Sequence, residues 1–134
     1  MGAAGTVLNS SDSINWGSQF APAMEDLNSV AYGDGLYVAV GASGTILTSK
    51  DATNLIAEVS GVTNTLYAVV YGDSRFVAVG TNGTVVTSVH GDDWEDHTHP
   101  SSAVFYGVTY GWNEFVAVGG LSSGNVPGAQ VSAD

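Results

Sequence analysis

The chain has 134 residues, with 13 acidic and 2 basic side chains, a formal net charge of −11 and no cysteine. Binding to phosphates needs several lysines or arginines, so this charge argues against nucleic acid and anionic membranes as partners. The lack of cysteine excludes a disulfide scaffold, a thiolate zinc site and a cysteine nucleophile. No apolar run approaches the ~18 residues of a membrane helix. No signal-peptide pattern follows Met1, and the length favours a single domain.

A repeat of 39 residues organises the chain. Similar segments begin at Leu27, Leu66 and Phe105, each ending in an apolar run and a glycine. A second block, glycine and threonine followed by two apolar residues, recurs with the same period at 5–8, 44–47 and 83–86. Tandem self-similarity of this kind is typical of repeat architectures.

Each period predicts four short strands and almost no helix. In the best-preserved copy, residues 66–71 alternate as a half-buried strand does, and Tyr-Gly-Asp-Ser supplies a hairpin turn. Residues 76–80 form a second, inner strand. Further strands are expected at 84–88 and 94–98 in this copy, and at 5–11 and 14–19 in the first partial copy.

The predicted fold is all-β, a β-propeller of four-stranded antiparallel blades. A sandwich gives no reason for a strict period, and a solenoid usually has a shorter coil. The predicted organisation is a partial blade with strands three and four, two full blades and an incomplete blade, over residues 1–26, 27–65, 66–104 and 105–134.

About three blades per chain are fewer than the four to eight of ordinary propellers. We therefore predict a homodimer that closes a six-bladed ring by strand exchange, the N-terminal segment of each copy completing the last blade of the other. Both ends carry third-strand sequence, and residues 129–134 are expected to be displaced. The main alternative is a fragment of a larger ring.

A turn motif follows each third strand. In its complete form it consists of a serine, an aspartate two positions later and a tryptophan four positions after that, as in Ser10, Asp12 and Trp16. In the copy of Ser49 and Asp51 the tryptophan is replaced by Leu55, and in the copy of Ser88 and Trp94 the aspartate is replaced by His90. The motif resembles the Asp-box, or BNR-type, turn of sialidase-like and photosystem-assembly-factor-like propellers. The wider repeat is similar to repeats of bacterial and phage surface proteins, which implies a location outside the cell or on a cell or virion surface.

This motif departs from the usual Asp-box, because the customary glycine is missing at Ile14 and the aromatic residue lies one position closer. A structural role is expected for it. The aspartate accepts hydrogen bonds from turn amides, and the tryptophan fills the gap between neighbouring sheets.

Catalysis is not expected. Sialidase chemistry uses three arginines to hold the substrate carboxylate, and Arg75 is the only arginine in the chain. Asp34, Asp73 and Glu114 could serve glycoside hydrolysis only if they met, and three blades would hold them far apart.

No cofactor is predicted. His97 and His99 would share a strand face and could bind a divalent metal with a nearby carboxylate, although a solvated acidic loop is the simpler interpretation.

The favoured function is a self-associating binding module for a carbohydrate or a protein. Trp112 replaces the aspartate of the other hairpin turns and is the leading ligand-contact candidate. Tyr32, Tyr71 and Tyr110 are further candidates, although their periodicity favours packing. The alternatives are a purely structural segment of a larger bacterial or phage surface propeller and, third, a glycoside-active enzyme.

Overall fold

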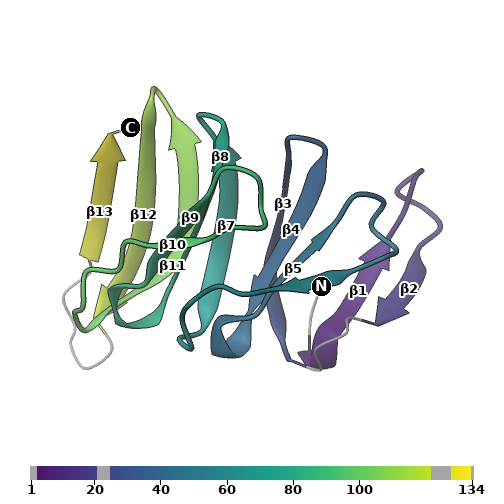
Figure 1. Ribbon diagram of the computed structural model, residues 1–134, viewed down its shortest axis with the longest axis horizontal. Helices are drawn as coiled ribbons and strands as arrows, with labels where there is room; N and C mark the ends of the chain where they lie inside the picture. The colour runs from purple at the N-terminus through teal and green to yellow at the C-terminus, as the bar shows by residue number, and fades with distance from the viewer. Residues whose placement is uncertain (1–2, 21–24, 122–127, 134) are drawn as a thin grey trace.

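The computed structural model describes residues 3–20, 25–121 and 128–133, which form four antiparallel sheets standing side by side (Figure 1). The first sheet pairs β1 (Thr6–Asn9) with β2 (Gly17–Phe20). The second contains β3 (Leu27–Gly33), β4 (Leu36–Gly41), β5 (Ile46–Ser49) and β6 (Ile56–Glu58). The third contains β7 (Leu66–Gly72), β8 (Arg75–Gly80), β9 (Val85–Ser88) and β10 (Glu95–Asp96). The fourth contains β11 (Ala103–Gly111), β12 (Glu114–Leu121) and β13 (Gly128–Ala133).

The all-β prediction with four-stranded antiparallel sheets is confirmed, and the helical content of the described residues is three short 3₁₀ turns, Ala3–Gly5, Ala42–Gly44 and Thr81–Gly83. None of the helices in these residues has the length and apolar character needed to cross a bilayer.

Several predicted strand boundaries are wrong. The strand expected over 94–98 is only β10, because the N–H of Val85 donates to Thr98 Oγ1, where a continued ladder would use a backbone carbonyl. The strand expected from Ile14 begins at Gly17, because the N–H groups of Ile14 and Asn15 donate to Asp12 instead.

The displacement of residues 129–134 is predicted for ring closure between two copies, and it stays a prediction. In the single chain, β13 pairs with β12 as the third strand of its sheet, with Ser132 opposite Phe115. Most of the irregular stretch expected before it, residues 122–127, lies outside the described residues.

The repeat is visible in the register of the strands. The aromatic pairs Tyr32–Tyr37, Tyr71–Phe76 and Tyr110–Phe115 stand opposite each other across the first hairpin of each repeat, with ring centroids 4.7, 4.7 and 4.6 Å apart. Cross-strand aromatic pairs of this kind stabilise antiparallel hairpins. The sheets are therefore built on one repeated packing scheme.

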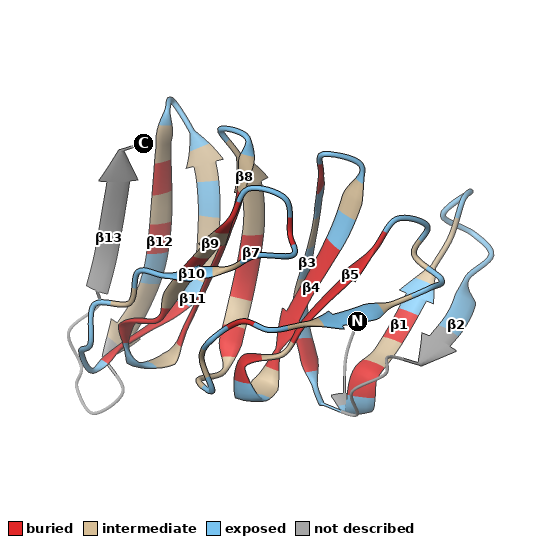
Figure 2. Ribbon diagram, in the orientation of Figure 1, coloured by how far each residue is buried: buried red, intermediate tan, exposed pale blue. Residues whose placement is uncertain are grey.

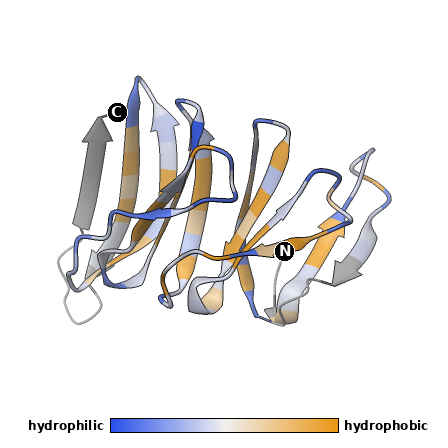
Figure 3. Ribbon diagram, viewed as in Figure 1, coloured by the Kyte–Doolittle hydropathy of each residue, from blue (hydrophilic) through white to orange (hydrophobic). Residues whose placement is uncertain are grey.

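The core lies between neighbouring sheets (Figure 2). One buried cluster joins the second and third sheets through residues such as Val38, Val40 and Phe76, and another joins the third and fourth through Val79 and Phe115. Figure 3 shows apolar residues along β4 and β12, with hydrophilic residues in many of the connecting loops. A single sheet cannot bury both of its faces, so each depends on its neighbours.

A tyrosine and a glycine form the contact between consecutive first strands. A Cβ built on Gly33 would lie 2.1 Å from the Tyr71 ring, and one on Gly72 would lie 2.4 Å from the Tyr110 ring. The glycines are required because the rings occupy the space of a side chain. Gly111, the third member of the series, has nothing within 4 Å of such a Cβ.

Candidate ligand-binding face

The loops that could contact a ligand gather at one end of the sheets. In an antiparallel meander, the connection between the first and second strands lies at the same end as that between the third and fourth. Figure 1 shows the β3–β4, β7–β8 and β11–β12 hairpins together at the top of the molecule. We call this end, with the β1–β2, β5–β6 and β9–β10 turns, the turn face.

The β1–β2 and β5–β6 turns are held by the same pattern of hydrogen bonds. Asp12 Oδ1 accepts the N–H groups of Ile14 (2.9 Å) and Asn15 (2.8 Å), and Ser10 Oγ accepts the N–H of Ser13 (2.8 Å). The second turn repeats this scheme around Asp51, whose Oδ1 accepts the N–H groups of Thr53 (3.0 Å) and Asn54 (2.8 Å). Each asparagine side chain also donates to its aspartate.

These hydrogen bonds determine the charge state of the two aspartates. The N–H of Asn15, followed by that of Ile14, holds the pKa of Asp12 well below its usual range. The N–H groups of Asn54 and Thr53 lower the pKa of Asp51 in the same way. Both carboxylates stay ionised at neutral pH with their oxygens engaged, which suits a structural role and not that of a general acid.

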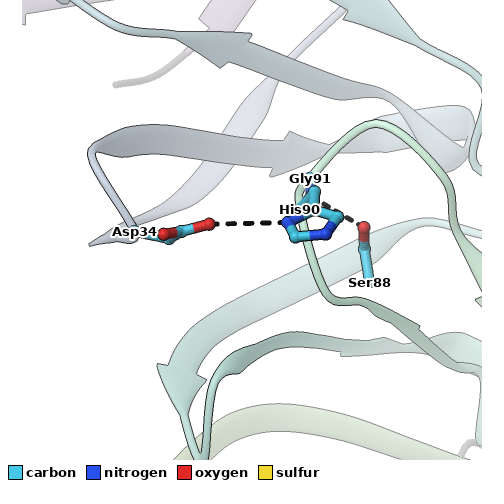
Figure 4. Close-up of polar contacts among 4 residues, drawn as sticks. All are labelled: Asp34, Ser88, His90 and Gly91. Atoms are coloured by element: carbon cyan, nitrogen blue, oxygen red, sulfur yellow. Dashed lines mark hydrogen bonds and ion pairs between the residues drawn. The ribbon is translucent and has the colours of Figure 1, made fainter.

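The β9–β10 turn has a different arrangement of hydrogen bonds (Figure 4). Ser88 Oγ accepts the N–H of Gly91 (2.7 Å), while His90 turns toward the second sheet and places Nδ1 3.6 Å from Asp34 Oδ2. The Trp94 indole N–H donates to the Gly91 carbonyl (2.8 Å), and the ring lies 6.5 Å from that of Phe76. His90 therefore contacts a neighbouring hairpin instead of organising its own turn.

The resemblance to the Asp-box predicts the glycine-favouring position of these turns at Ile14. In the structure this position lies one residue earlier. The left-handed residues are Ser13 (φ 64°), Ala52 (φ 64°) and Gly91 (φ 87°). Only the third copy therefore has a glycine where the backbone favours one.

Trp112 occupies a strained and open position. The three hairpins place two consecutive residues at positive φ, as type I′ turns require, and this geometry favours aspartate, asparagine and glycine. Trp112 has φ 54° and is 97% exposed. Its counterparts, Asp34 and Asp73, suit the turn better. A bulky aromatic residue in this conformation costs stability without a packing gain in the chain, and such strain can mark a binding site.

The three tyrosine candidates lie in the packing series described above. Tyr71 and Tyr110 are partly buried between consecutive first strands, where their rings cover Gly33 and Gly72. Tyr32 is 58% exposed because the described residues place no such glycine beneath it. Of the four aromatic candidates, Trp112 is therefore the one most available to a ligand.

The histidine pair lies away from the turn face. His97 Nε2 is 3.3 Å from Glu95 Oε2 on the same strand edge. Within the described ranges, no group of three histidine, aspartate or glutamate side chains is arranged to hold a metal ion. The structure therefore supplies no third ligand to His97 and His99 from this part of the chain.

An apolar cavity of about 330 Å³, which the sequence reasoning missed, lies between the third and fourth sheets. Its wall includes Val77, Val79, Val85, Phe115 and Ala117, and His97 and His99 stand at its edge. The cavity separates two repeats and lies away from the turn face.

No family model matches the sequence, and no curated protein matches it. Its structure is similar to a solved structure titled "YCF48 bound to D1 peptide", with a TM-score of 0.70 and 12% sequence identity. The match covers 100% of this chain and 49% of the other, so this chain spans about half the length of that protein. At this identity the similarity concerns the fold, which is β-propeller-like.

Proposed function

We propose that the chain is a non-enzymatic β-propeller module that binds a polypeptide at its turn face. The observation that carries the proposal is Trp112, an almost fully exposed tryptophan held in a left-handed conformation at a hairpin tip. Tryptophan is strongly enriched among the residues that dominate binding energy at protein interfaces. The Asp-box-like turns at Ser10–Trp16 and Ser49–Leu55 serve as the rigid supports of this face.

The charge of the turn face indicates the chemistry of the ligand. Six aspartates lie in its turns, namely Asp12, Asp34, Asp51, Asp73, Asp92 and Asp93. Lys50 in the β5–β6 turn and Arg75 at the start of β8 are the only lysine and arginine in the whole chain, so six aspartates face two cations at this end. A net negative surface attracts cationic ligands and raises their association rate. The proposed ligand is therefore a segment rich in lysine and arginine, for which Trp112 also offers a cation–π contact.

A propeller fold with a peptide partner has a precedent in the similar structure. Its title states that YCF48 is bound to the D1 peptide. This supports a polypeptide ligand over the carbohydrate that the sequence also allowed.

The proposal includes self-association. The chain contributes two four-stranded sheets and two shorter ones, which we interpret as two blades over 27–65 and 66–104 with partial blades over 1–26 and 105–134. Two copies would then close a six-bladed ring by strand exchange. Closure covers the exposed ends of the arc, because each partial blade gains a neighbour.

Fluorescence anisotropy with labelled synthetic peptides tests the binding function. A short peptide rich in lysine and arginine should bind, more weakly as salt is raised, whereas an acidic peptide of the same length should not. Trp112→Ala should weaken binding by about 30-fold, the loss expected for a tryptophan hot spot. Tyr106→Ala, which removes another exposed aromatic ring from β11, is the matched control.

The alternatives give different results in the same experiment. Binding on a glycan array that depends on Trp112, with no peptide binding, would replace the polypeptide by a carbohydrate. If neither peptide nor glycan binds, and Trp112→Ala changes neither assay, the chain is a purely structural segment. Hydrolysis of glycosides by the purified chain would support the enzymatic alternative.

A further inference from the structure

The cavity between the third and fourth sheets is apolar and large. Its volume is about 330 Å³, and its apolar wall includes Val77, Val79, Val85, Phe115 and Ala117, with His97, His99 and Ser101 also lining it. Empty apolar cavities of roughly 150 Å³ already hold a benzene molecule. Since protein interiors are close-packed, a gap of this size between two repeats needs an explanation.

The equivalent space between the second and third sheets is filled. One repeat earlier, its wall consists of the buried residues Val38, Val40, Ile46, Phe76 and Ala78, which belong to one cluster. Trp94 packs against this cluster, and its indole N–H is satisfied by the Gly91 carbonyl. The cavity therefore has the environment that holds a tryptophan in the neighbouring repeat.

None of the described residues places a tryptophan in the cavity. The chain has three tryptophans, of which Trp94 fills the neighbouring interface and Trp112 projects from a hairpin tip. The third is Trp16, which precedes Trp94 by two full repeats and follows Ser10 as Trp94 follows Ser88. Trp16 is 58% exposed on the first sheet. The chain thus has an unfilled tryptophan site near one end and an uncovered tryptophan at the other.

Other positions at the two ends show the same mismatch. Val118 is 51% exposed, whereas its counterparts Val40 and Val79 are buried. Gly111 receives no ring, whereas Gly33 and Gly72 each do. At the opposite end, Tyr32 has no glycine beneath it, and Leu8 is exposed where its counterparts Leu47 and Val86 are buried. Figure 1 shows that the first and fourth sheets lie at opposite ends of the molecule, so one copy cannot satisfy both sets.

We propose that a second copy of this chain fills the cavity with its Trp16. The partner's β1–β2 hairpin takes the place of β13 beside β12 and completes the fourth sheet with third and fourth strands. The partner's Trp16 then enters the cavity, and the partner's Tyr32 covers Gly111. This inference rests on the proposed self-association and specifies its route.

The strand registers allow this exchange. In the third sheet, Val79 is opposite Val85 and Phe76 is opposite Ser88. The corresponding pairs place Val118 opposite the partner's Val7 and Phe115 opposite the partner's Ser10. In the single chain, β13 occupies this register with Ala129 and Ser132. The partner's hairpin offers the same ladder and adds a tryptophan, which no described residue near β13 provides.

Sedimentation equilibrium and native mass spectrometry test the exchange with matched variants. The full-length chain should form a dimer, and Trp16→Ala should weaken dimerisation by about 100-fold or more, because truncating a buried tryptophan is costly. Val59→Ala, which truncates an 84% exposed apolar residue just after β6, should leave dimerisation unchanged. Thermal melting of Trp16→Ala should match that of the dissociated parent chain, since Trp16 is exposed there, and this shows that the variant folds.

A cysteine cross-link gives a second, independent readout in this cysteine-free chain. The register places Asn9 of one copy opposite Val116 of the other, as Thr87 is opposite Val77. The double variant N9C/V116C should form a disulfide-linked dimer under mild oxidation, whereas the control N9C/N113C should not.

The outcomes separate this inference from the proposed function. A parent chain that stays monomeric overturns the exchange and the self-association, whereas peptide binding by that monomer would keep the binding function. A dimer that tolerates Trp16→Ala and does not cross-link through N9C/V116C overturns the exchange alone.

Discussion

The contact between tyrosine and glycine on consecutive first strands allows one substitution to be tested against its own internal control. Gly72→Ala would add a Cβ 2.4 Å from the ring of Tyr110, whereas Gly111→Ala would add one with nothing within 4 Å. Neither glycine has a positive φ, so alanine is compatible with both backbones. The two variants therefore differ only in the contact with the next sheet.

The expected difference follows from the packing of Tyr110. Its ring is held against Phe115, with centroids 4.6 Å apart, so it cannot swing aside without breaking a second contact. Forcing an extra methyl group into such a site costs about 2 kcal/mol. Gly111→Ala removes only unfolded-state entropy and should stabilise the chain by about 0.5 kcal/mol. For a chain of this length, 2 kcal/mol corresponds to a lowering of the Tm by roughly 8 °C.

Thermal and urea unfolding followed by circular dichroism measure the effect. The protein should be dilute enough for copies to be dissociated, because Gly111 is also a proposed contact with a second copy. Gly33→Ala, whose Cβ would lie 2.1 Å from the Tyr71 ring, should behave like Gly72→Ala. Equal stability of Gly72→Ala and Gly111→Ala would refute the assignment of this contact as the link between sheets.

Four further substitutions test the turns and the core. Trp94→Ala should lower the free energy of unfolding by about 3 kcal/mol, measured by urea titration, because it empties the space between two sheets; a loss below about 1 kcal/mol would contradict that placement. The pKa of Asp51 is lowered by folding, so its stabilisation is present above the unfolded value near 3.9 and is lost as pH falls through the lower folded value. Asp51→Ala should therefore flatten the decline of the Tm below about pH 4, and an unchanged acid profile would argue against the turn hydrogen bonds. Ala52→Gly should raise the free energy of unfolding by about 0.5–1 kcal/mol by relieving a left-handed alanine, and a lower Tm would contradict the backbone assignment. Trp112→Asp should stabilise the hairpin by about 1 kcal/mol while abolishing binding of the cationic peptide, a trade-off that disappears if Trp112 has no ligand.

Much of the strand arrangement could be predicted because the same strand and turn pattern recurs in three copies of the repeat. The hairpins at Asp34 and Asp73 combine turn residues with flanking apolar strands, so local chemistry and repeat agree. Strand ends were less predictable. Asp12 Oδ1 and Thr98 Oγ1 accept backbone N–H groups that a strand would otherwise use, and this competition depends on side-chain geometry.

The candidate site could be predicted only in part. Trp112 stood out because it replaces an aspartate, but its left-handed conformation depends on the hairpin that holds it. Trp16 and Trp94 look equivalent in sequence, and both were expected to fill gaps between sheets. Only Trp94 has a sheet on the required side, which is a property of the arrangement of repeats and not of the motif.

The packing of each sheet against its immediate neighbours has a consequence for how the chain opens. The second and third sheets are each flanked on both sides, whereas the first and fourth each have one neighbour in the single chain. Stability in such an array is close to a sum of nearest-neighbour interactions. Amide hydrogen exchange should therefore be slowest in the inner strands of the second and third sheets and faster in the first and fourth, and ring closure would remove this difference by leaving no sheet at an edge.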